Sequence, residues 1–93
     1  MSDESPTWYA YIVRCADSTL YTGVTNNVPQ RVFAHNSGKG AKYTKPKTRR
    51  PVTLLYVEPL PTKGEALSRE HAIKKLKREE KLVLIADNLP KAP

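Results

Sequence analysis

The segment WYAYIVRCADSTLYTGVT, residues 8–25, places two stretches rich in aromatic and β-branched residues on either side of a short polar turn. This composition is typical of β-strands, so the segment predicts a β-hairpin with strands over 8–14 and 19–25. The hairpin is the first unit of a sheet, and it needs further strands or helices packed against it to be stable.

Tyrosine side chains recur on one face of this hairpin. Successive side chains of a strand point to opposite faces of its sheet. Tyr9, Tyr11 and Val13 therefore share one face of the first strand, and Tyr21 and Gly23 share one face of the second. Tyr11 and Tyr21 can consequently line a single surface.

A helix is predicted directly after the hairpin. Asn26 or Asn27 can serve as its N-cap, Pro29 suits its first turn, and the pattern continues over 29–36 until Gly38 ends it.

Two polar residues of this helix, Arg31 and His35, are spaced four apart. Residues at i and i+4 lie on the same face of a helix. Their side chains can therefore act together on one surface.

The remainder of the chain predicts four more segments. A strongly basic stretch over 39–50 reads as an exposed loop, and an apolar strand follows over 51–59. A helix begins at Thr62, and the apolar run 82–86 forms a closing helix. The order strand, strand, helix, strand, helix, helix predicts an α+β domain with a small three-stranded sheet flanked by helices.

The helix that begins at Thr62 carries a carboxylate on its apolar face. The segment TKGE, residues 62–65, matches a capping box. The predicted buried stripe consists of Ala66, Leu67, Ile73 and Leu76. Glu70 falls on that stripe, and burying an unpaired carboxylate is costly. We therefore expect Glu70 to bind a cation or, as the alternative, to form an ion pair with Arg31 or Arg69.

Length and composition fit one small domain. The 93 residues, 39% of them hydrophobic, predict a single domain over 8–88 with flexible ends at 1–7 and 89–93. The only cysteine, Cys15, has no partner for an intramolecular disulfide, which favours a reducing cytoplasm. No stretch approaches the ~20 apolar residues of a membrane span. The acidic, polar amino end also differs from a signal peptide.

The charge balance indicates the class of partner. Sixteen Lys and Arg against nine Asp and Glu give a net charge of +7. Such a charge favours a polyanionic partner, and nucleic acid is expected as that partner ahead of an anionic membrane surface.

Together these residues resemble the GIY-YIG endonuclease superfamily, and specifically its small single-domain bacterial group. The first family motif is present as YAY, residues 9–11, and the second as YTG, residues 21–23. Arg31 and His35 match the helical arginine and histidine of the family, and Glu70 matches its metal-binding glutamate. Five positions in the right order form a strong signal, although each motif alone is weak.

The chain departs from the family at two places. Tyr9 replaces the glycine of the first motif. Many active relatives carry an asparagine about a dozen residues after the glutamate, where this chain has Leu82, and Asn88 lies further along.

The resemblance implies metal-dependent hydrolysis of phosphodiester bonds. One Mg²⁺ or Mn²⁺ on Glu70 would neutralise the phosphate, and Arg31 would hold a non-bridging oxygen. Tyr21 or Tyr11 would bind or activate the attacking water; a free tyrosine titrates near ~10, so it would need the metal, Arg31 or His35 close by. The resemblance favours DNA over RNA as the partner. It implies no small-molecule cofactor and no membrane.

Further residues would grip the nucleic acid backbone on either side of the site. Gly23 would let the chain approach the scissile phosphate, or it is simply a strand glycine at a bulge. Tyr43 would stack on an unpaired base or pack under the basic loop. The predicted cationic contacts are Lys39, Lys42, Lys45, Lys47, Arg49, Arg50, Lys74 and Lys75.

Three functions stay open. The first is an endonuclease acting on DNA, with branched, damaged or single-stranded forms, as in DNA repair, as the first substrates to test. The second is a non-catalytic nucleic-acid-binding module, which the missing asparagine favours. The third is a structural partner in a larger nucleic-acid assembly.

Overall fold

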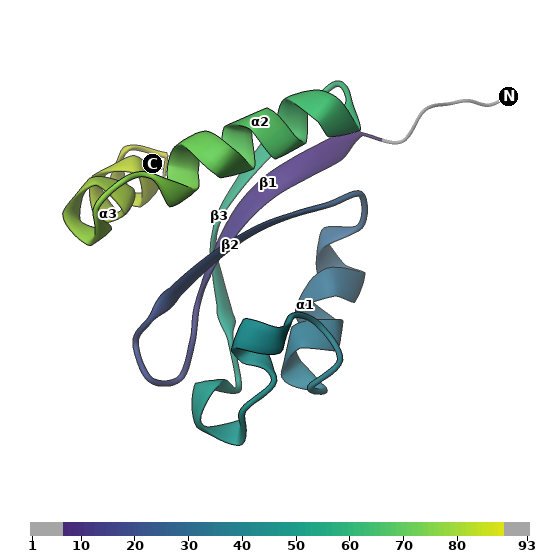
Figure 1. Ribbon diagram of the computed structural model, residues 1–93, viewed down its shortest axis with the longest axis vertical. Helices are drawn as coiled ribbons and strands as arrows, with labels where there is room; N and C mark the ends of the chain where they lie inside the picture. Colours follow the sequence, from purple (N-terminus) through teal and green to yellow (C-terminus); the bar gives the residue numbers. More distant parts are fainter. Residues whose placement is uncertain (1–6, 89–93) are drawn as a thin grey trace, which may run out of the picture.

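The computed structural model describes residues 7–88. The outer parts of the predicted flexible ends, 1–6 and 89–93, lie outside the described residues. The elements in chain order are β1 (Trp8–Arg14), β2 (Leu20–Thr25), α1 (Val28–Asn36), β3 (Thr53–Leu60), α2 (Lys63–Lys74) and α3 (Arg78–Asp87). The predicted α+β class and element order are confirmed (Figure 1).

The sheet has the strand order β2-β1-β3, and both pairs are antiparallel. In the β1–β2 pair, Tyr11 lies opposite Gly23 and Val13 lies opposite Tyr21. The predicted shared face of the hairpin is therefore confirmed. The irregularity in the sheet lies between β1 and β3, where Ile12 pairs with Tyr56 and Val13 with Leu54, so that Leu55 of β3 is skipped, and not at Gly23.

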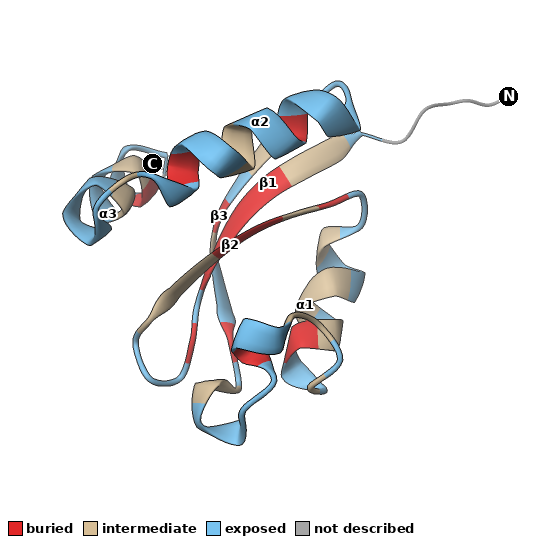
Figure 2. Cartoon of the chain, viewed as in Figure 1, coloured by how far each residue is buried: buried red, intermediate tan, exposed pale blue. Residues whose placement is uncertain are grey.

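Helices cover both faces of the sheet, so β1 is buried on each side (Figure 2). On the side of α2 and α3, the core consists of Ala10, Ile12, Tyr56, Ile73 and Ile85. On the side of α1, it consists of Tyr11, Val13, Cys15 and Val52, with Tyr21 and Val32 packed against it. Alternation along β1 thus separates a purely structural core from a face that carries polar tyrosines.

Local capping signals begin two helices where the sequence predicts them. The Asn27 side chain accepts a hydrogen bond from the Gln30 N–H at 3.1 Å, and the Thr62 hydroxyl accepts one from the Glu65 N–H at 3.1 Å. The prediction for the closing helix, 82–86, is too short. This helix, α3, begins at Arg78 because the carboxylate at position 80 accepts from the Lys77 N–H at 2.7 Å. Within residues 7–88, none of these helices has the length and apolar character that crossing a bilayer requires.

The basic stretch 39–50 is exposed at most of its positions, as predicted, but it is folded and not a plain loop. It contains two short 3₁₀ turns, Lys42–Thr44 and Lys47–Arg49. Arg49 donates to the Asp17 carboxylate at 3.1 Å and to the Tyr43 carbonyl at 3.0 Å. The bond to Asp17 fastens the stretch to the β1–β2 turn, a contact between distant parts of the chain that local sequence patterns do not reveal, and the bond to Tyr43 closes the stretch on itself.

The buried stripe of α2 differs from the prediction at two positions, because Leu76 lies beyond the end of the helix and is only half-buried. Ala66 and Ile73 are fully buried, whereas Leu67 is 43% exposed. Arg69 donates to Glu58 at 2.8 Å and so joins α2 to β3. Because the helix faces the sheet through small and polar residues near its middle, Leu67 is turned outward.

Candidate active site

A buried tyrosine hydroxyl lies at the centre of the site. The Tyr11 side chain is 1% exposed, and its hydroxyl lies 2.7 Å from Nε2 of His35. Arg31 Nε donates to the same oxygen at 3.3 Å. A Cβ atom at position 23 would lie 2.6 Å from this hydroxyl, so glycine is needed there to leave room for the phenol ring. The structure thus gives Gly23 a role other than the two considered above.

Thr44 determines the protonation pattern of His35. The Thr44 hydroxyl lies 2.7 Å from Nδ1 of His35 and donates its proton to the Ala41 carbonyl at 3.1 Å. It must therefore accept a hydrogen bond from Nδ1–H. This leaves Nε2 unprotonated, so Nε2 accepts a hydrogen bond from the Tyr11 hydroxyl.

Burial keeps both rings neutral. The pKa of His35 is lowered to about 4, first by burial and then by the positive charge of Arg31. Burial also raises the pKa of Tyr11, and the hydrogen bond from Arg31 partly opposes that rise. Hydrogen bonds link Thr44, His35, Tyr11 and Arg31 in this order, and at neutral pH Arg31 is therefore the charged member of the series.

Arg31 extends from this buried chain to the surface. Its pKa is raised, chiefly by the hydrogen bond with Tyr11, with a smaller contribution from the nearby Tyr21. The side chain lines a hollow of about 280 Å³ together with Thr25, Asn27, Gln30 and Ala34.

Tyr21 is the more accessible tyrosine of the pair. It is half-buried, and its ring centroid lies 5.3 Å from that of His35 and 6.5 Å from that of Tyr11. On its other side it stacks on Tyr43 at 5.8 Å. Tyr43 also contacts Arg49, whose guanidinium carbon lies 4.0 Å from the ring centroid. Tyr43 is thus engaged within the protein, which favours packing over base stacking.

Glu70 lies at the edge of the core with its side chain 18% exposed. Its carboxylate is 3.3 Å from the Lys74 ammonium, so the expected alternative pairing with Arg31 or Arg69 is wrong. Its negative charge makes a small contribution to the raised pKa of Tyr11.

A single carboxylate is a sufficient protein ligand for one kind of metal site. Within residues 7–88, no three His, Cys, Asp or Glu side chains gather to hold a metal by themselves. Mg²⁺ commonly binds through one or two carboxylates, with water and substrate phosphates as the remaining ligands. Glu70 fits a site of this kind and not a preformed all-protein one.

The predicted backbone-binding cations fall into two groups. Arg49 is held by Asp17, and the Arg50 guanidinium packs over Gly38, where an added Cβ would lie 3.0 Å from it. The other group is fully on the surface and consists of Lys39, Lys42, Lys45, Lys47, Lys74 and Lys75. Only this second group has ammonium groups that are accessible to a long polyanion, and Lys74 already pairs with Glu70.

Sequence reasoning missed Thr44, although it is fully buried and holds His35. It lies nine residues after His35 in a segment with no helix or strand pattern, so no local signal pointed to it. Asn88, which lies further along than the absent asparagine, is occupied at the end of α3, where its amide donates to the Leu84 carbonyl at 2.9 Å.

Fold and site together define a member of the GIY-YIG family, whose catalytic-domain profile matches residues 7–82. The chain belongs to this family, which points to a nuclease. A similar protein is the UPF0213 protein SH2523 of Staphylococcus haemolyticus, 54% identical over 79 residues, 85% of this chain and 94% of the relative. Another is the UPF0213 protein CPE1444 of Clostridium perfringens, 55% identical over 78 residues, 84% of this chain and 82% of the relative.

Two solution NMR structures have the same fold. The UPF0213 protein BH0048 from Bacillus halodurans is 40% identical, with a TM-score of 0.57 over 88% of this chain and 85% of its own. The protein EF2693 from E. faecalis is 35% identical, with a TM-score of 0.59 over 100% of this chain and 97% of its own. The fold expectation is therefore confirmed by structures as well as by sequence.

Proposed function

We propose that the protein is a divalent-metal-dependent endonuclease that hydrolyses phosphodiester bonds in DNA. The observation that supports this most is the hydrogen-bonded chain Thr44, His35, Tyr11 and Arg31. Three buried polar side chains hold one guanidinium at the wall of a hollow. Such a network costs desolvation, and preorganised donors of this kind are what stabilise developing charge in a transition state.

Each residue of the cluster has a separate role. Arg31 holds a non-bridging phosphate oxygen through the nitrogens that Tyr11 leaves free. Tyr21 presents the more accessible hydroxyl and orients the attacking water. Tyr11 and His35 are positioning residues, because both are buried and act on the substrate through Arg31.

Glu70 is the residue that would hold the metal. A bound Mg²⁺ or Mn²⁺ would neutralise charge on the phosphate and stabilise the leaving oxygen. The Lys74 ammonium must then move away from the carboxylate; pairs at i,i+4 on a helix are worth only ~0.3–0.5 kcal/mol and the lysine is half exposed, so the exchange is inexpensive.

A non-catalytic nucleic-acid-binding module is the second candidate function. Two observations favour it: the Glu70 carboxylate is paired with Lys74, and Asn88 is engaged as a cap of α3. This candidate predicts DNA binding that is insensitive to Mg²⁺ and to the charge of Glu70.

Cleavage of duplex, flap, junction and single-stranded DNA with and without Mg²⁺ or Mn²⁺ tests the proposal. In the variant Glu70→Gln, cleavage should collapse while DNA binding in EDTA persists, because shape is kept and the ligand charge is lost. Its melting temperature should stay close to that of the parent, since the substitution removes only one i,i+4 ion pair, whose lysine is half exposed. Glu79→Gln, at an exposed carboxylate of α3, is the matched control and should cleave normally.

The tyrosines are tested by removing single hydroxyls. Tyr21→Phe should lower kcat with little change in KM, whereas Tyr11→Phe should also raise KM because Arg31 loses its anchor. Tyr43→Phe, which keeps the ring stacked on Tyr21, should behave as the parent. The endonuclease proposal would be rejected if the parent cleaved no substrate while it and all variants bound DNA without metal. That result would support the non-catalytic binding module.

A further inference from the structure

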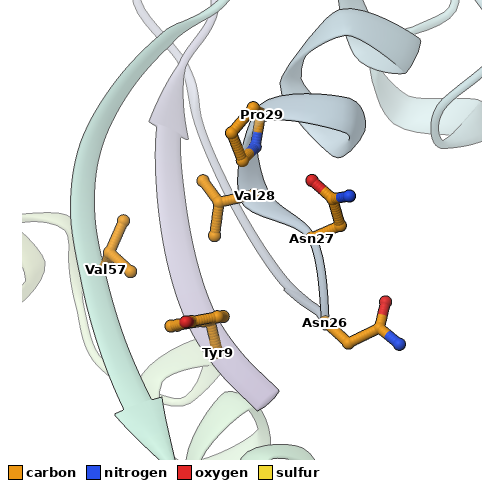
Figure 3. A pocket seen from close by; sticks show the side chains of 6 residues that line it. All are labelled: Tyr9, Asn26, Asn27, Val28, Pro29 and Val57. Carbon is orange, nitrogen blue, oxygen red and sulfur yellow. The ribbon is translucent and has the colours of Figure 1, made fainter. Parts of the chain in front are cut away.

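A second hollow, of about 450 Å³, opens beside the first turn of α1 (Figure 3). Its walls are apolar and come from three elements, with Tyr9 on β1, Val57 on β3 and Val28 at the start of α1. The two valine side chains face the space above the Tyr9 side chain in this view. Pro29 and the side-chain amides of Asn26 and Asn27 complete the lining.

The hollow exists because α1 does not extend over β3. The side chains of Tyr9 and Tyr11 lie on the same face of β1. Tyr11 pairs with Val57 of β3. No helix covers this part of the face, so Val57 stays 38% exposed. An aromatic ring and an aliphatic side chain are thereby left open to solvent next to two amides, an arrangement typical of ligand sites.

The chemistry of the lining selects among ligands. It contains no charged side chain, so it suits neither a phosphate nor a metal ion. A flat aromatic ligand can stack on Tyr9 between the valines, while amides offer both donors and acceptors to its edge. An unstacked nucleobase has these properties, and proteins read such bases by stacking and by hydrogen bonds to the base edge.

The position of the hollow indicates which nucleic acid it would take. Asn27 lines both this hollow and the smaller one that contains Arg31. A strand with one phosphate on Arg31 would therefore pass the first turn of α1 with a neighbouring base close to Tyr9. The net charge of +7 favours a polyanion over an uncharged aromatic molecule.

We propose that the hollow at Tyr9 binds a single unstacked nucleobase next to the phosphate held by Arg31. The inference rests on the proposed function, because it takes Arg31 as the phosphate-binding residue. It makes single-stranded DNA, or the unpaired part of a flap or frayed end, the preferred substrate class. A perfect duplex must first unstack a base, which costs free energy.

Binding in EDTA tests this site without cleavage. Tyr9→Ala should weaken binding of a single-stranded oligonucleotide by roughly 5- to 150-fold, the range of one lost base stack, and should leave duplex binding nearly unchanged. Tyr9→Phe keeps the ring and should bind as the parent. Phe33→Ala removes an aromatic side chain that is 71% exposed on α1 but does not line the hollow, so it is the matched control.

An abasic residue moved along the oligonucleotide locates the base. The parent should lose affinity when the abasic residue occupies one register, and Tyr9→Ala should show no such register. If Tyr9→Ala fails to fold, Asn26→Ala replaces it, since Asn27 and not Asn26 caps α1.

Three results would overturn the inference in different ways. Parent-like binding of single strands by folded Tyr9→Ala would reject the base site alone. Failure of the parent to bind any DNA would reject the proposed function as well. Concentration-dependent dimerisation that Val57→Asp abolishes would assign the hollow to a second copy of the chain instead.

Discussion

Thr44 shows how one residue outside the recognised motifs can decide the chemistry of a site. Its hydroxyl fixes the proton of His35 on Nδ1, and Nε2 is left to accept from Tyr11. With the other tautomer, Tyr11 would have to accept from both His35 and Arg31, and its own proton would have no partner. Each buried donor and acceptor of the three-residue chain is satisfied in only one arrangement, which makes the guanidinium position well defined.

The lowered pKa of His35 predicts a specific pH dependence of stability. The pKa is about 4 in the folded chain and ~6.5 in an unfolded one, so the unfolded state binds more protons between these values. The free energy of unfolding should therefore fall as pH is lowered through this window, by about 1 kcal/mol between pH 7.5 and 5.5 from this group. Carboxylates such as Asp17 act mainly below that range.

Urea unfolding at several pH values and an NMR titration of the imidazoles measure the effect. His35 should keep its Nδ1–H signature to below pH 5. Protonation of His35 above pH 6 would contradict the buried, neutral assignment.

At the level of elements, the β1–β2 hairpin supplies the space in which the site is built. The Tyr11 ring lies over Gly23 of β2, and a side chain at position 23 would clash with the phenol. The helix α1 then places Arg31 and His35 over the same face. The hairpin and α1 thus supply Tyr11, Arg31 and His35, the basic stretch supplies Thr44, and α2 adds Glu70.

Gly23→Ala should consequently damage the site more than the fold. The added Cβ would lie 2.6 Å from the Tyr11 hydroxyl and 2.8 Å from its ring carbon, so the ring must move and lose its bonds to His35 and Arg31. We expect a loss of about 1–3 kcal/mol in unfolding free energy, as for an overpacked core. Gly64→Ala is the control; its Cβ would meet only the Thr62 hydroxyl at 4.0 Å, and stability should be unchanged or up to ~1 kcal/mol higher. Equal effects of the two substitutions would show that position 23 is not constrained by Tyr11.

The elements that could be predicted are those with local signals. Asn27 and Thr62 cap their helices through residues three positions away, and alternation in the hairpin follows from the strand itself. The basic stretch and Thr44 differ from the prediction because long-range contacts decide them, whereas the early start of α3 was missed although its signal, Glu80 bound to the Lys77 N–H, is local. Arg49 folds the basic stretch by binding Asp17, thirty-two positions away, and Thr44 becomes a site residue only because that stretch is folded.

For the whole molecule, the net charge is the property most easily read from the sequence, but it does not act evenly. Arg49 is paired with Asp17 and Arg50 packs half-buried over Gly38, whereas Lys45 and Lys47 are exposed. The basic stretch therefore combines a structural role with a surface suited to phosphates. Counting its cations from the sequence overestimates how many can bind nucleic acid.

The salt dependence of DNA binding separates these two roles. Lys45→Ala combined with Lys47→Ala should weaken binding to all sequences alike and reduce the slope of log K against log salt by up to ~0.9 per lost phosphate contact. Thermal stability should not change, because both side chains are exposed.

Lys63→Ala with Lys81→Ala removes the same charge from α2 and α3 and should leave the slope nearly as in the parent. Arg49→Ala should instead lower the melting temperature, since it removes the bonds to Asp17 and Tyr43. Equal slope changes in both lysine pairs would mean that DNA responds to net charge alone and that the basic stretch is no binding surface.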